Sequence, residues 1–198
     1  MLIKNQIKNK GAIGISAIIG IIVVILIIVG VMLMSSYNKL VTLNTQVDTQ
    51  WSQVETQYQR RFDLIPNLVE SAKAVMTQEQ EVFTAIAEAR TRYAGATTPD
   101  AKAAAAGELE QGLGRLLAIV ENYPQLRSSE TVQTLMAQLE GTENRISVER
   151  GRYNTSVQDY NLAVRRFPGS LMAGLFGFDA RTPFAADQGA ESAPKVQF

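Results

Sequence analysis

The side chains available for catalysis in this chain are those of Asp, Glu, Arg, Lys and Tyr, because its 198 residues include neither Cys nor His. Without His there is no imidazole base and no Ser-His-Asp triad. Without Cys there is no disulfide, thiolate ligand or sulfur nucleophile. A zinc ion would have carboxylates alone to bind, which is unusual. The composition therefore favours a structural or interaction protein, and we expect no catalytic residues, no metal site and no cofactor.

The few patterns that could suggest chemistry have simpler interpretations. Glu79 and Glu81 are two residues apart on a predicted helix and face different directions, so they do not form a carboxylate pair. The segment Gly112-Leu113-Gly114 lies in a helical pattern, follows no strand and lacks the third glycine of a nucleotide loop, so close helix packing or a local break is expected there. Three aromatic residues recur every seven positions, as core residues of a helix do. They are Tyr153, Tyr160 and Phe167.

The charges are balanced but unevenly placed. Nineteen basic residues match nineteen acidic ones, yet Lys4, Lys8 and Lys10 all precede the first acid. The chain from Gly11 onward keeps 16 basic against 19 acidic residues. This distribution excludes a polybasic nucleic-acid binder.

An apolar segment near the N-terminus predicts a transmembrane helix. No charged side chain occurs from Gly11 to Asn38, and the 23 residues from Ala12 to Met34 are almost entirely apolar. As a helix they are about 35 Å long, enough to cross a hydrocarbon core of about 30 Å. A cleaved signal peptide is the alternative, but its apolar core would be shorter and Ser35-Ser36 is a poor cleavage site. Three lysines before the segment outnumber Lys39 after it, which predicts a cytoplasmic N-terminus and an extracytoplasmic C-terminal domain.

Small residues share one face of this predicted helix. Ala12, Ser16 and Gly20 are four residues apart. Such spacing lets helices approach closely in lipid, so self-association through this face is a hypothesis. The alternative is that small residues are simply common in membrane helices.

The rest of the chain has a helical period and no strand alternation. A first seven-residue stripe directly follows the membrane segment, and its members are Leu40, Val47 and Val54 with Trp51 and Tyr58 beside them. Pro66 lacks an N–H group and disfavours a helical residue before it, so we expect this helix to kink or restart there.

Three further helical patterns follow. A second runs from Leu68 to about Gly95, and a third begins at the cap Thr98 and stops before Pro124. The last covers residues 129–167, and its seven-residue repeat consists of Val132, Leu139, Ile146, Tyr153, Tyr160 and Phe167. The predicted fold is all-α: an N-terminal transmembrane helix that continues into an antiparallel bundle of three to four long helices.

The patterns divide the chain into four expected parts: a short basic segment (1–10), a transmembrane helix (11–36), a helical bundle (37–168) and a tail (169–198). The tail is rich in Gly, Ala and Pro, with scattered Phe residues. It either packs back on the bundle or serves as a docking segment for a partner.

Charged residues on the seams of these helices predict a polar network. Arg61 falls on the first stripe, and Glu143 and Arg150 fall on the last helix. Buried polar groups must be paired, so we expect Arg60 or Arg61 to bind Glu143 across helices. The remaining expected members are Asp63, Asn67, Asn144 and Arg145. The alternative is that part of this set forms an exposed binding surface.

Six short motifs occur in order. Residues 60–70 read RRFDLIPNLVE, 121–126 read ENYPQL and 139–146 read LEGTENRI, followed by Tyr-Asn at 153 and 160 and Phe-Pro at 167. This combination resembles the LemA family of bacterial membrane proteins, from about residue 37 to residue 167. The resemblance implies a single-pass membrane protein with a helical-bundle domain and no established enzymatic activity. Its members are often encoded near membrane-associated metalloproteases, which implies a setting in envelope quality control.

These observations lead to two functional hypotheses. The first is a non-enzymatic membrane-anchored scaffold or adaptor that acts through protein–protein contacts in the bacterial envelope, with lipid around residues 12–34 and a second copy of the chain as a possible partner. The alternative is a regulatory subunit or substrate adaptor of a membrane-associated protease. No nucleic acid is expected as a partner.

Overall fold

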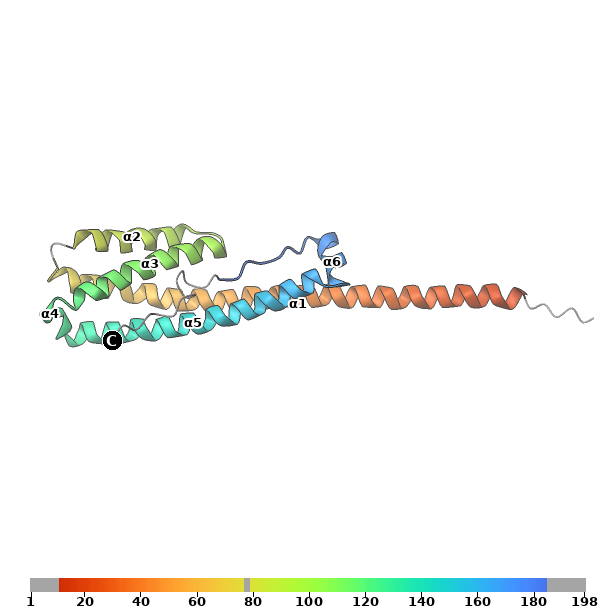
Figure 1. Ribbon diagram of the computed structural model, residues 1–198, viewed down its shortest axis with the longest axis horizontal. Coiled ribbons are helices and arrows are strands. Elements are labelled where there is room, and N and C mark those ends of the chain that lie inside the picture. Colours follow the sequence, from red (N-terminus) through yellow and green to blue (C-terminus); the bar gives the residue numbers. More distant parts are fainter. Residues whose placement is uncertain (1–10, 77–78, 185–198) are drawn as a thin grey trace, which may run out of the picture. The chain divides into compact units, whose positions relative to one another are not determined.

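The computed structural model describes residues 11–76 and 79–184, with side chains from Ser16 onward. All regular elements of these residues are helices, which confirms the all-α prediction. They are α1 (Gly11–Lys73), α2 (Gln80–Gly95), α3 (Pro99–Val120), α4 (Pro124–Arg127), α5 (Glu130–Arg165) and α6 (Gly169–Phe176) (Figure 1).

The first helix is longer than the sequence predicts. We expected a kink or restart at Pro66, but α1 includes Pro66 and ends only at Lys73, so a restart there is wrong. Pro66 removes one backbone hydrogen bond, and its neighbours Ile65 and Leu68 are buried in the core, which favours the continued helix. The second predicted pattern is therefore shared between the end of α1 and α2.

The other helix boundaries follow local signals. Thr98 accepts a hydrogen bond from the Ala101 amide as the N-cap of α3, with Pro99 at the first helical position, as predicted. The last long helix ends at Arg165, just before Pro168.

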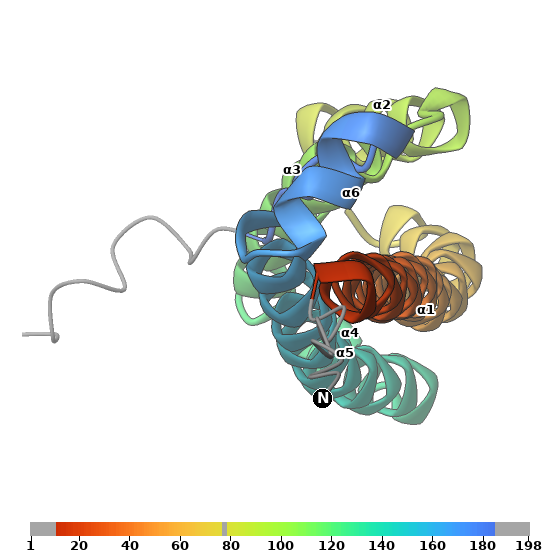
Figure 2. The same ribbon diagram turned by 90° about the vertical axis from the view of Figure 1, so that its right-hand side faces the viewer.

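The chain forms two compact units, which are described separately. Among the described residues, unit 1 consists of residues 11–44 together with Tyr160–Ala180, and unit 2 consists of Thr45–Asp159 together with residues 181–184. In unit 2 the helices α1, α2, α3 and α5 run alternately in opposite directions (Figure 1). The turned view shows α2 and α3 side by side (Figure 2). A Cβ atom on Gly112 of α3 would lie 3.1 Å from Cγ1 of Ile86 in α2, so the glycine allows close packing here.

The core of unit 2 is built on the predicted seven-residue stripes. On α1 the buried predicted members are Val47, Val54, Tyr58 and Leu68, and Ile65 is buried with them. On α5 they are Val132, Leu139, Ile146, Tyr153 and Val157. The spacing of the apolar residues thus sets which face of each helix enters the bundle.

In unit 1, α6 packs against α1. Its buried Met172 and Ala173 contact Leu40, and partly buried Leu33, Tyr37, Ala163, Val164 and Phe178 pack around them. The prediction that Phe167 is a core residue is wrong, because its side chain is 75% exposed. The reason is that α5 ends at Arg165, so the helical period no longer sets the direction of its side chain.

The beginning of α1 fits a location in a membrane. Among the described residues, α1 alone is long and apolar enough to cross one. The large apolar side chains between Ile18 and Met34, apart from Leu33, are 44% to 68% exposed. In water such a surface would be unfavourable.

Candidate functional site

A charged residue occupies one position of the buried seam of α1. Arg61 comes seven residues after Val54 and seven before Leu68, and all three are buried. Because a buried guanidinium needs partners, the surroundings of Arg61 define the first candidate site.

Arg61 reaches two carboxylates on two other helices. Its Nη2 donates a hydrogen bond to Oε2 of Glu143 on α5. Its Nη1 lies 4.0 Å from Oε1 of Glu110 on α3. The side chain of Arg61 is 8% exposed, whereas those of Glu110 and Glu143 are 32% and 36% exposed. One arginine therefore connects α1, α3 and α5 near the edge of the core.

A second arginine completes the cluster. Nε and Nη2 of Arg150 donate to the hydroxyl of Tyr58 at 3.0 and 2.9 Å. Nη2 also donates to Oε2 of Glu110 at 3.3 Å. We call the five residues Tyr58, Arg61, Glu110, Glu143 and Arg150 the polar cluster.

Burial shapes the protonation of this cluster. It raises the pKa of the Glu110 carboxyl, and the adjoining Glu143 carboxylate raises it further, while Arg150 and Arg61 oppose both effects. Burial also raises the pKa of the Tyr58 phenol against the opposing influence of Arg150. The two bonds from Arg150 are part of that opposing influence, because a hydrogen bond donated to the phenol oxygen favours its ionised form.

The arrangement pairs charges across helices. Two guanidinium groups balance two carboxylates, and the described residues contain no group of His, Cys, Asp and Glu suited to a metal ion. Interhelical networks of this kind fix helix register. This geometry is therefore suited to holding α1, α3 and α5 in register.

The structure places the other predicted network residues outside the polar cluster. Arg60, Asp63, Asn67, Asn144 and Arg145 are all exposed. Asp63 accepts a hydrogen bond from Gln59 on its own helix. A groove of about 490 Å³ between α1 and α5 brings Arg60, Asp63 and Arg145 together.

Two members of the polar cluster, Tyr58 and Glu110, are not among the predicted network residues. The seven-residue period places Tyr58 on the apolar stripe but does not give the partner that a buried hydroxyl needs. The position of Glu110 could be predicted from its spacing. It comes four residues after Ala106 and three before Leu113, which are both buried on α3. An acid between two core positions of a helix faces the edge of that core.

Residues 182–184, the last that the structure describes, pack on the helices of unit 2. The side chain of Asn154 exchanges two hydrogen bonds with the backbone of Phe184, at 3.1 and 2.8 Å. The Phe184 ring stacks on Trp51 and meets Tyr153 edge-on, with ring centroids 5.8 and 5.3 Å apart. This part of the predicted tail therefore packs back on the helices.

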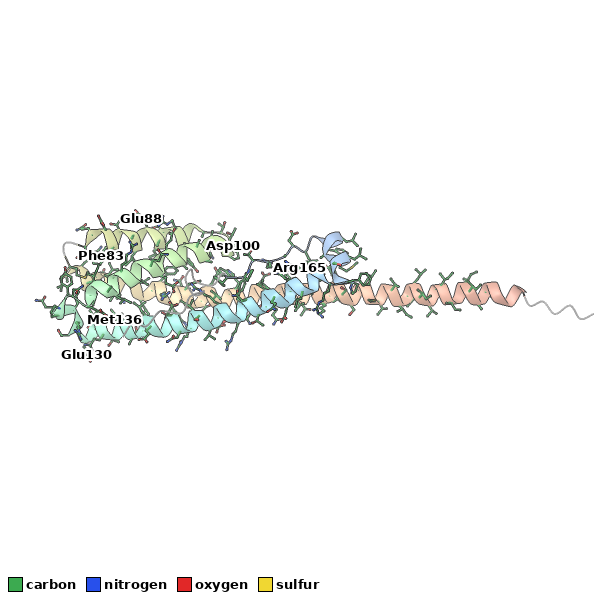
Figure 3. The ribbon with its side chains drawn as sticks, in the orientation of Figure 1. Phe83, Glu88, Asp100, Glu130, Met136 and Arg165 are labelled. Carbon is green, nitrogen blue, oxygen red and sulfur yellow. The ribbon has the colours of Figure 1, made fainter. Side chains whose placement is uncertain are left out.

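Two contiguous hollows lie along α2. They have volumes of about 900 and 540 Å³ and share Lys73, Phe83, Ala87 and Thr91. Glu88 lies at the larger hollow, and both Phe83 and Glu88 are labelled on α2 in Figure 3. A probe attached at an exposed position of α2, such as Glu88, would therefore report on molecules that contact these hollows.

Part of the predicted packing face of the membrane helix can be located. Ser16 and Gly20 are exposed on α1, and a Cβ atom on Gly20 would meet nothing within 4 Å. The side chain of Ala12 lies outside the described residues. Whether a second copy of the chain packs on this face stays a prediction.

Comparison with known proteins agrees with the motifs. The model of the LemA family matches residues 50–198. The magnetosome proteins MamQ 2 and MamQ 1 of Paramagnetospirillum magneticum are each 28% identical to the chain over 172 residues. The magnetosome protein MamQ of Magnetospirillum gryphiswaldense is 29% identical over 172 residues. Each alignment covers 74% of this chain and 63% of the relative, so the chain spans less than two thirds of the length of these curated relatives.

Proposed function

Because the chain belongs to the LemA family, we propose that it is a non-enzymatic, membrane-anchored helical scaffold or adaptor that acts through protein–protein contacts in the bacterial envelope. Its apolar segment holds it in lipid, and its helices present a surface to other proteins. We propose further that the N-terminus is cytoplasmic and the bundle extracytoplasmic, because Lys4, Lys8 and Lys10 precede the apolar segment.

One observation carries this proposal: a single helix serves both the membrane and the bundle. Between Ile18 and Met34 the large side chains of α1, apart from Leu33, are apolar and exposed, as lipid contact requires. From Val47 to Leu68 the same helix supplies buried seam residues and Arg61. The charges of the polar cluster are used to join helices, which supports a binding or scaffolding role over catalysis.

The alternative is a regulatory subunit or substrate adaptor of a membrane-associated protease. It makes use of the same anchor and the same helical surface, and it differs in the identity of the partner. The two are therefore separated by an experiment that identifies what lies next to unit 2 in the native membrane.

We would place a photoreactive residue at Glu88 or at Arg127 in the full-length protein and irradiate intact cells. Both positions are exposed, Glu88 on α2 and Arg127 on α4. A matched control carries the same residue at Val148, which is exposed on α5. Mass spectrometry then identifies the adducts.

A ladder of self-adducts supports a self-assembling scaffold, and one heterologous non-protease adduct supports an adaptor. A membrane protease as the single adduct supports the alternative. Adducts at Glu88 and Arg127 that match those at Val148 in kind and yield would contradict a specific contact surface on α2 and α4, and the proposal would fall.

A further inference from the structure

The short helix α6 presents apolar side chains on its outer side. Residues 167–178 contain no charged side chain, and Ser170 supplies the single polar one. Phe167 is 75% exposed, and Leu171, Leu175 and Phe176 are 48%, 67% and 60% exposed. A helix that faces water normally directs polar residues outward, so the outer side of α6 calls for an apolar environment.

The inner side of α6 fixes its place on α1. Met172 and Ala173 pack against Leu40, with Leu33 beside them. At the edge of this contact, Tyr37 of α1 meets the Phe178 ring at a centroid distance of 5.8 Å and the Phe176 ring at 4.8 Å, and Phe176 remains 60% exposed. The contact region on α1 therefore begins where the exposed apolar stretch ends, at Met34.

This position corresponds to the interfacial layer of a bilayer. From Leu33 to Leu40 a helix rises about 10 Å. The polar layer on each side of a hydrocarbon core is about 5–8 Å thick, and interfacial helices bury their apolar face by about 5–10 Å. With Ile18 to Met34 in the hydrocarbon core, α6 lies at the depth of the headgroups and the first acyl carbons.

The charges around α6 fit an anionic lipid surface. The exposed cations of unit 1 among the described residues are Lys39, Arg165 and Arg166, and the single acid is Asp179. Figure 3 labels Arg165 at the end of α5, next to α6. Long cationic side chains beside an apolar surface reach lipid phosphates while their stems remain in the apolar layer.

We propose that α6 is a second membrane contact of this protein: Phe167, Leu171, Leu175 and Phe176 insert into the interface of an anionic phospholipid bilayer, with Lys39, Arg165 and Arg166 at the phosphates. The inference rests on the membrane anchoring of the proposed function. Its consequence is that unit 1 contacts lipid twice, through the beginning of α1 and again through residues 167–176.

Depth-dependent fluorescence quenching tests this proposal on the full-length chain. The sequence contains no Cys, so a single cysteine can carry an environment-sensitive dye at one chosen site. The test variant is Leu175→Cys, in which the exposed side chain makes room for the dye without disturbing the core. The controls are Ile25→Cys in the apolar stretch and Val148→Cys on α5. The native side chains at both positions are 53% exposed.

The labelled proteins are reconstituted into vesicles of equal parts phosphatidylcholine and phosphatidylglycerol, with nitroxide lipids labelled near the headgroup or deep in the acyl chain. We expect the dye at Leu175 to lose most of its fluorescence to the shallow nitroxide and less to the deep one. The dye at Ile25 should respond to the deep nitroxide, and the dye at Val148 to neither.

Quenching at Ile25 without quenching at Leu175 overturns the proposal for α6 and leaves the membrane anchor intact. Quenching at neither site overturns both. A dye at Leu175 that is shielded from aqueous iodide but insensitive to both nitroxides shows that another protein or a second copy covers α6, and this result also overturns the lipid contact.

Discussion

Removing Arg61 tests whether the polar cluster stabilises the bundle. In the Arg61→Leu variant, a leucine continues the apolar seam between Val54 and Leu68. The same change leaves the Glu110 and Glu143 carboxylates next to each other, with Arg150 as the remaining cation that contacts Glu110. We expect the loss of pairing to outweigh the gain in apolar burial.

The size of the effect follows from the exposure of the partners. Removing one partner of a fully buried ion pair costs about 3–5 kcal/mol, because the other charge stays desolvated. Here the remaining carboxylates are 32% and 36% exposed, so water screens part of that cost. We expect the Arg61→Leu variant to lose about 2 kcal/mol of unfolding free energy, and the Glu143→Gln variant about 1 kcal/mol.

The assay is urea unfolding of the full-length protein in detergent, followed by circular dichroism. The double variant Arg61→Leu/Glu143→Gln closes a mutant cycle, and groups in contact typically couple by about 0.5–3 kcal/mol. The control is Glu140→Gln, because Glu140 is an exposed acid on the same helix as Glu143. This control should change the unfolding free energy by less than about 0.5 kcal/mol.

Two results would refute the reasoning. An Arg61→Leu variant as stable as the wild type would mean that the cluster gives no net stabilisation and that an apolar seam serves as well. Strictly additive effects in the cycle would mean that Arg61 and Glu143 contribute independently, against the contact between them.

Three further predictions concern other contacts. Burial above all raises the pKa of Glu110. Between the ordinary glutamate pKa and the raised one, the folded protein holds a proton that the unfolded chain has released, so the stability of the protein falls as pH rises through this range. Chemical unfolding of the Glu110→Gln variant over the same range should show a smaller fall. Asn154→Ala should release residues 182–184 and expose Trp51, the single tryptophan of the sequence. We expect a red shift of its emission and stronger acrylamide quenching, and unchanged emission would contradict the contact of Phe184 with Trp51. The Gly169→Ala variant should be less stable in thermal unfolding, because its Cβ atom would lie 2.1 Å from a backbone oxygen. In the Gly141→Ala variant the new Cβ atom meets nothing within 4 Å, so this variant should be more stable by about 0.5–1 kcal/mol. Equal shifts in the two variants would contradict the contact at Gly169.

The helical period predicts the core of this protein well, since it is a property of one helix at a time. Each residue of the stripe from Val132 to Tyr160 on α5 is buried. The prediction fails at Phe167, where the helix has ended at Arg165 and the period no longer applies. The restart expected at Pro66 comes from local propensity and not from the period, and it is wrong because the burial of the neighbouring residues favours the continued helix.

Contacts between helices are harder to predict, because a repeat gives the buried face but not the neighbour of each residue. The seam position of Arg61 predicted its burial and a carboxylate partner on the last helix. The carboxylate of Glu110 and the hydroxyl of Tyr58 depend on how α3 and α5 are placed against α1. That placement follows from the packing of many side chains at once.

The polar residues of segment 60–70 nevertheless divide by the same period. Arg61 is seven residues from both Val54 and Leu68, which puts it on the seam. Arg60, Asp63 and Asn67 are spaced by three and four residues, which puts them together on another face of α1, and all three are exposed. The polar residues of this one motif therefore lie on two faces of α1. Arg61 on the inner face joins the helices of the bundle, while Arg60, Asp63 and Asn67 on the outer face take no part in the packing of the core.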